Sequence, residues 1–175
     1  MFVGQQLKWH AIHQPDHIIT SYRGKKMTYA QFYREAINVA GFFQKKGYKK
    51  GDIIALFLHN SDVLLIAYYA CQLGGFTAMP VNTKLAPPEV QYIFHHSEAK
   101  ALIYDTRLLH ILHEIPREFH QFQDRLMVGG EDTFRAIAGE NTDAFMPPQI
   151  EADDTAVIFY TSGTTGRPKG VMLSA

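Results

Sequence analysis

The sequence has little cysteine, no excess of either charge and no long apolar run. Its single cysteine, Cys71, cannot form an internal disulfide or build a thiolate metal site. We therefore expect a reducing compartment, the cytoplasm. Seventeen Lys and Arg residues balance seventeen Asp and Glu residues, so there is no electrostatic case for nucleic acid as a partner. The longest apolar run, 63–71, has nine residues, whereas a membrane span needs about 20. We expect no span.

The composition is typical of a folded domain. The chain has 175 residues, of which 46% are apolar, and this is enough for one domain with a substantial core. Thirteen glycines and eight prolines do not fit a disordered or fibrous chain.

Apolar strands alternate with helices along most of the chain. We expect strands at 53–58, 76–81, 101–104, 125–128 and 155–160. We expect helices at 29–43, 63–73, 87–96, 106–114 and 133–138. The helix at 63–73 is apolar nearly all round, which predicts deep burial. The alternation predicts an α/β fold with a mainly parallel sheet flanked by helices.

The first 30 residues predict a helix followed by a small hairpin. Residues 9–16 have helical spacing, and 17–22 and 27–29 are typical of two short strands. The hairpin leads into a helix whose first turn has a capping-box pattern, with Thr28 as N-cap and Gln31 three residues later.

The segment 160–170 carries the chemical signal. It reads Tyr-Thr-Ser-Gly-Thr-Thr-Gly-Arg-Pro-Lys-Gly. Glycines allow backbone N–H groups to approach oxygen atoms closely, and consecutive N–H groups form an anion-binding concavity. Hydroxyls add donors and a lysine adds positive charge. This composition suits a polyphosphate better than the alternative, a solvated surface turn.

The segment does not match the common nucleotide-binding loops. A Walker loop ends in Gly-Lys-Ser/Thr, whereas here Pro168 precedes Lys169 and Gly170 follows it. The glycine spacing also differs from Gly-x-Gly-x-x-Gly. The segment continues into 171–173, which is typical of a strand. We therefore expect a glycine-rich connection between two strands.

Residues 155–170 resemble the signature of the AMP-forming adenylating enzymes. That superfamily contains acyl-CoA synthetases, luciferases and the adenylation domains of peptide synthetases. Two weaker matches occur in the same order as in the family. Residues 27–32 resemble the first core motif, with departures at Met27, Gln31 and Phe32, and residues 73–82 resemble the second. The resemblance covers the whole chain.

The resemblance implies a two-step reaction. A carboxylate attacks the α-phosphate of ATP, with Mg²⁺ as counter-charge, and gives an acyl-adenylate and pyrophosphate. A thiol, usually that of coenzyme A, then takes the acyl group. The resemblance also implies which residues grip the β- and γ-phosphates: Thr161, Ser162, Gly163, Thr164, Thr165, Gly166 and Lys169.

The family's later motifs, including the catalytic lysine of its C-terminal domain, would lie beyond Ala175. We therefore expect residues 1–175 to be the front portion of the large N-terminal domain of an acyl-CoA synthetase for a fatty or other aliphatic acid. The C-terminal domain is absent, so the chain alone should be inactive. Asn82 and Thr164 favour this class over peptide synthetases. The alternatives are an adenylating enzyme for an aryl acid or an amino acid, and a non-catalytic nucleotide-binding or interaction module.

Three further features bear on metal binding, nucleophilic chemistry and self-association. His10, His13 and His17 have spacing that could suit a metal, but no cysteine lies near them and Pro15 interrupts the run, so we predict no metal site. Cys71 lies in an apolar helix, where a thiol keeps a high pKa and is a poor nucleophile. The strand-like segment 171–173 has no following strand, so its edge could pair with a second copy of the chain.

Overall fold

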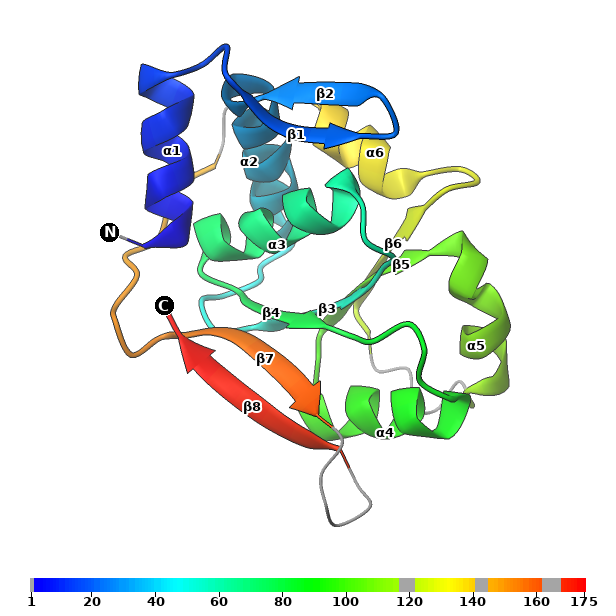
Figure 1. Ribbon diagram of the computed structural model, residues 1–175. Helices are drawn as coiled ribbons and strands as arrows, with labels where there is room; N and C mark the ends of the chain where they lie inside the picture. Colours follow the sequence, from blue (N-terminus) through cyan, green and yellow to red (C-terminus); the bar gives the residue numbers. More distant parts are fainter. Residues whose placement is uncertain (1, 117–121, 141–144, 162–167) are drawn as a thin grey trace.

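The computed structural model describes residues 2–116, 122–140, 145–161 and 168–175. In this part of the chain, six strands form one sheet in the order β6-β5-β3-β4-β7-β8 (Figure 1). The first five of these run parallel, and β8 is antiparallel to β7. The strands are β3 (Ile53–Phe57), β4 (Thr77–Pro80), β5 (Ala101–Asp105), β6 (Asp124–Val128), β7 (Thr155–Thr161) and β8 (Lys169–Ser174). The predicted α/β fold with a mainly parallel sheet is confirmed.

Helices cover both faces of the sheet (Figure 1). One face carries α1 (Val3–His13), α2 (Tyr29–Lys45), α3 (Asp62–Gly74) and α6 (Thr133–Gly139). The other face carries α4 (Pro87–Ser97) and α5 (Leu109–Glu114), the latter preceded by the 3₁₀ turn η1 (Thr106–Leu108). A separate hairpin of β1 (Ile18–Tyr22) and β2 (Lys25–Thr28) leads into α2.

Side chains at the helix starts explain where α2 and α3 begin. The Thr28 hydroxyl accepts a hydrogen bond from the Gln31 backbone N–H at 3.3 Å, and the Thr28 N–H donates to the Gln31 amide oxygen at 3.0 Å. This is the predicted capping box. The Ser61 hydroxyl accepts from the Leu64 N–H at 3.2 Å and starts α3. Each side chain satisfies a backbone donor that the first helical turn leaves unpaired.

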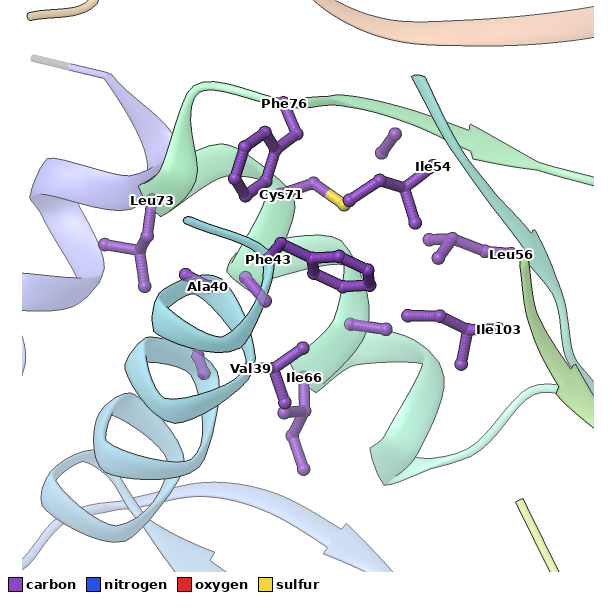
Figure 2. Packing of buried hydrophobic residues seen from close by; sticks show 14 of the residues in the cluster. Val39, Ala40, Phe43, Ile54, Leu56, Ile66, Cys71, Leu73, Phe76 and Ile103 are labelled. Atoms are coloured by element: carbon purple, nitrogen blue, oxygen red, sulfur yellow. The ribbon is translucent and has the colours of Figure 1, made fainter. Parts of the chain in front are cut away.

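The core has two layers because the central strand β3 is buried on both faces. Ile54 and Leu56 pack into the cluster under α2 and α3, whereas Ala55 and Phe57 pack into the cluster under α4 and α5. This alternation follows from the two-residue period of a strand. Figure 2 shows the first layer, in which Val39, Ala40 and Phe43 of α2 and Ile66, Cys71 and Leu73 of α3 lie with Phe76 over Ile54, Leu56 and Ile103.

The boundaries of α1 and the burial of α3 differ from the prediction. Helix α1 spans Val3–His13 instead of 9–16. The prediction that α3 is buried nearly all round was wrong at Leu65, which is 44% exposed. Helix α3 packs against α1, α2 and the sheet, and the side turned away from these neighbours faces solvent. No helix in the described ranges is long and apolar enough to cross a membrane.

An ion pair between the buried Asp105 and the exposed Arg107 lies at the end of β5, and His59 links it to the end of β3. The Asp105 carboxylate accepts hydrogen bonds from the Arg107 backbone N–H at 2.9 Å and from the Arg107 guanidinium, and it lies 3.1 Å from His59 Nδ1. The Asp105 side chain is 7% exposed. Burial opposes its ionisation, but the hydrogen bonds from Arg107 and His59 outweigh this and lower the Asp105 pKa to about 2.

Replacing this carboxylate should weaken the fold in a pH-dependent way. The pKa in the folded state is about 2, below its ordinary value of 3.8, so the stabilisation is present above pH 4 and is lost as the pH falls toward 2. We expect Asp105→Asn to lower the free energy of unfolding by about 1–2 kcal/mol at pH 7. Urea unfolding measured between pH 7 and pH 3 should show this difference narrowing. Asp16→Asn, at an exposed carboxylate, is the control, and equal losses in both variants would contradict the assignment.

Strand β8 presents an exposed apolar edge. Val171 is 45%, Met172 69% and Leu173 47% exposed. Among the described residues, β7 is the only strand that pairs with β8. The proposal that this edge pairs with a second copy of the chain therefore keeps its physical basis, because an unpaired apolar strand edge is a template for further pairing.

If β8 mediates pairing, a charge at its centre should prevent it. We expect sedimentation of the chain at micromolar concentrations to detect a dimer, and Met172→Lys to shift it to monomer, since a charged side chain on an edge strand opposes pairing. Leu65→Lys places the same charge on the exposed side of α3 and should leave the dimer intact. A chain that is monomeric at all concentrations, or dissociation by both variants, would exclude pairing through β8.

Candidate phosphate-binding site

The glycine-rich segment joins β7 to β8. Thr161 is the last residue of β7 and Lys169 is the first residue of β8, and the two are paired across the antiparallel ladder. The predicted connection between two strands is thus confirmed. Both residues are exposed. The other predicted site residues lie outside the described residues: Ser162, Gly163, Thr164, Thr165 and Gly166.

The end of β7 lies at the carboxyl edge of the parallel sheet. Strand β7 is parallel to β4 and pairs with it at Val157 and Ala78. Val157 and Ile158 are buried, whereas Thr161 is exposed. The chain therefore leaves the sheet at its surface, at the edge where open α/β sheets bind ligands. The position of the hairpin fits the polyphosphate chemistry that its composition predicts.

The last residues of β7 are held from the side by α4. The Tyr160 hydroxyl lies 2.7 Å from His96 Nδ1, and the His96 ring stacks on Tyr92 with 5.3 Å between ring centroids. Burial, and then the nearby Tyr92, raise the pKa of the Tyr160 phenol. The phenol therefore stays protonated at neutral pH. Sequence reasoning missed this contact, because no local pattern links residues 64 positions apart.

Gly170 allows the Tyr160 ring to lie against β8. The two residues are paired across the hairpin. A Cβ atom at Gly170 would lie 3.3 Å from Tyr160 Cζ and 3.3 Å from the Ile158 side chain, which is tighter than ordinary packing. Tyr160 is therefore fixed between α4 on one side and the β8 backbone on the other.

Two other candidate sites have no support in the described part of the chain. It contains no group of three or more His, Cys, Asp or Glu side chains that could hold a metal ion. Cys71 is a free, buried thiol, and burial raises its pKa. A thiol that stays protonated and out of reach of solvent is a poor nucleophile.

The sequence matches a known protein family over nearly its whole length. The model of the AMP-binding enzyme family matches residues 7–175. A 2-succinylbenzoate–CoA ligase of Bacillus licheniformis is 38% identical over 166 residues, which are 95% of this chain and 33% of that protein. A long-chain-fatty-acid–CoA ligase, FadD13, of Mycobacterium tuberculosis is 34% identical over 152 residues, which are 84% of this chain and 29% of that protein. The chain thus spans about a third of the length of these relatives.

A solved structure agrees with the sequence matches. The inhibitor-bound N-terminal domain of FACL13 from Mycobacterium tuberculosis superposes with a TM-score of 0.85 at 29% identity. The match covers 99% of this chain and 44% of that domain structure. The family model extends over all but the first six residues, and the fold agrees over nearly the full length. The chain belongs to the AMP-binding enzyme family.

Proposed function

We propose that the chain is the front part of the large N-terminal domain of an ATP-dependent acyl-CoA synthetase, a ligase of fatty acid metabolism. The observation that carries the proposal is the β7–β8 hairpin, which places Thr161 and Lys169 at the carboxyl edge of the sheet in a chain of this family. Two relatives named as CoA ligases support it. The coverage of 44% of an N-terminal domain supports the assignment as a part of such a domain.

The reaction proposed for the whole protein has two steps. A carboxylate oxygen attacks the α-phosphorus of ATP, and the bond to the β-phosphate oxygen breaks, which gives acyl-AMP and pyrophosphate. The thiol of coenzyme A then attacks the acyl carbon, loses its proton and displaces AMP. The chain alone is proposed to bind ATP through the hairpin without completing either step. The single free cysteine supports a cytoplasmic site for the reaction.

The hairpin would stabilise the negative charge that moves onto the leaving pyrophosphate. The Lys169 ammonium supplies a positive charge, and the hydroxyls and backbone N–H groups of 161–166 supply hydrogen-bond donors. In phosphoryl transfer most of the catalysis is positioning and charge stabilisation of this kind. Mg²⁺ would arrive with ATP as its counter-charge. The described residues hold no preformed group of three or more His, Cys, Asp or Glu ligands for it.

The identity of the carboxylate has two candidates. We propose a fatty or other aliphatic acid, as for the relative named as a long-chain-fatty-acid ligase. The relative that is 38% identical is named as a ligase of 2-succinylbenzoate, which favours an aryl acid as the second candidate.

An alternative function is that of a non-catalytic nucleotide-binding module. This alternative predicts ATP binding without turnover in any longer form of the protein.

Removing the lysine charge should weaken ATP binding to the chain. Lys169→Ala is expected to raise the Kd for ATP about tenfold, since a charge-assisted contact with phosphate contributes about 1.5–3 kcal/mol, reduced here by solvent exposure. Titration calorimetry measures both proteins at the same salt concentration. Lys25→Ala removes an exposed lysine from β2 and should leave the Kd unchanged. Equal affinity for ATP in wild type and Lys169→Ala would contradict the proposal that this hairpin binds the phosphates of ATP.

The chain alone should not catalyse adenylation of a carboxylic acid. We expect no pyrophosphate release above background from ATP with a fatty acid or with 2-succinylbenzoate, because the family motifs for adenine, ribose and the catalytic lysine are not in residues 1–175. A coupled pyrophosphate assay checks this, with a full-length family member as the positive control. Release at a rate similar to that control would show that these residues suffice for adenylation.

A further inference from the structure

We propose that a groove at the amino edge of the sheet binds an aliphatic monocarboxylate. The groove has a volume of about 340 Å³ and lies between α1, α2, the end of α3 and the connector to β7, residues 145–150 (Figure 1). Leu73 shortly precedes β4 and Ile150 shortly precedes β7, and these strands are parallel, so both residues mark the amino edge. Thr161 and Lys169 lie at the carboxyl edge, so the groove is separate from the proposed phosphate-binding site.

The walls of the groove are mostly apolar. The lining includes five aliphatic or aromatic side chains from elements far apart in the sequence: Phe2, Tyr33, Leu73, Phe145 and Ile150. Leu73 is buried, and Tyr33 and Phe145 also pack against the core cluster under α2 and α3. An alkyl chain in this groove would be removed from water, which is the main source of affinity in sites of this kind.

Two hydrogen-bond donors line the groove and have no partner among the described residues. One is the Lys8 ammonium of α1 and the other is the Tyr33 phenol of α2. Burial raises the pKa of Tyr33, so its hydroxyl remains a donor at neutral pH. No acidic side chain of the described ranges lines the groove, so Lys8 gives it a positive charge. A carboxylate is an acceptor only, and it accepts from an ammonium and from a hydroxyl.

The connector wall of the groove is held in place at two points. The Gln44 amide nitrogen donates to the Met146 carbonyl at 2.7 Å, and the Gln44 amide oxygen accepts from the Met146 N–H at 3.2 Å. A Cβ atom at Gly75 would lie 2.9 Å from Pro148 Cγ and 3.1 Å from Ile150 Cδ1, so these two side chains pack against the backbone after α3. A groove with fixed walls has little ordering entropy to lose when a ligand binds.

A monocarboxylate with an aliphatic chain matches both the walls and the donors. An uncharged apolar molecule gains nothing from the Lys8 ammonium, and a polyphosphate would place several charges against an apolar wall, where charge is costly to bury. A single carboxylate pairs with Lys8 and Tyr33 while its chain covers Leu73 and Ile150. The volume lies at the lower end of the range for small-molecule sites, about 300–1,000 Å³, which favours a chain of medium length.

Octanoate is the probe, and 1-octanol is its uncharged counterpart with the same chain length. In an NMR titration of the methyl-labelled chain, octanoate should shift the methyl signals of Leu73 and Ile150, and the shifts give the Kd. We expect 1-octanol to bind about 3- to 10-fold more weakly, because it lacks the charge that pairs with Lys8. Lys8→Ala and Tyr33→Phe should each raise the Kd for octanoate about 3- to 10-fold, the effect of losing one such contact. Lys8→Ala should leave the Kd for 1-octanol unchanged.

Two further variants serve as controls. Lys25→Ala removes an exposed lysine of β2 that does not line the groove and should bind octanoate like wild type. Lys169→Ala should do the same, so a failure of the hairpin to bind ATP would leave the groove unaffected.

Four results would overturn the groove as a carboxylate site. The first is no shift of the Leu73 and Ile150 methyl signals at millimolar octanoate, and the second is equal affinity for 1-octanol and octanoate. The third is a Kd for octanoate that neither Lys8→Ala nor Tyr33→Phe raises. The fourth is weaker octanoate binding in Lys169→Ala, which would place the ligand at the hairpin instead.

Discussion

Burial of β3 on both of its faces is the constraint on which the rest of the structure depends. Its alternate side chains enter two separate core layers, so helices must cover the sheet from both sides. Each fully buried side chain of the size of Ile54, Leu56 or Phe57 contributes about 1.5–3 kcal/mol. Parallel neighbours, connected by helical crossovers, are the arrangement that satisfies this burial. One result is that the carboxyl ends of β3, β4, β5 and β7 all lie at one edge.

That edge holds the groups with specialised chemistry in the described chain. The Asp105 ion pair joins the ends of β3 and β5, and the glycine-rich segment begins and ends at the hairpin beside β4. Strand β8 turns back along β7, so Lys169 lies opposite Thr161. A single antiparallel strand added to a parallel sheet therefore brings Lys169 to the same edge as Thr161.

Local signals made much of this fold predictable. The capping pair Thr28 and Gln31 and the buried apolar strands depend on neighbours in sequence, and the structure confirms them. The start of α1 could not be predicted in the same way. Only Gly4 and Leu7 of this helix are buried, so it has no continuous apolar stripe. A Cβ at Gly4 would lie 3.2 Å from the Gln72 carbonyl oxygen, which shows that the glycine serves close helix packing.

The candidate site also has one part that the sequence predicts and one part that it could not predict. The composition of 160–170 predicts a phosphate-binding segment, because the donors and the cation lie within a few residues of each other in the sequence. The contact between His96 and Tyr160 depends on how α4 packs beside β7, and the sequence pattern does not predict it. The exposure of Leu65 was missed for a similar reason, since an all-apolar helix does not show which side the sheet and its neighbours leave open.

The pairing of β7 with β4 also has a consequence for the order of folding. Val157 and Ala78 are paired although they lie 79 residues apart in the chain (157 − 78), whereas β7 and β8 are neighbours in sequence and form a local hairpin. A hairpin closes in about 1–10 μs, but long-range strand pairing must first overcome the entropy of closing a large loop. We therefore expect the hairpin to form early and to dock late, after β3, β4 and β5 have assembled. Thr161 and Lys169 would then reach their place at the sheet edge as one of the last events of folding.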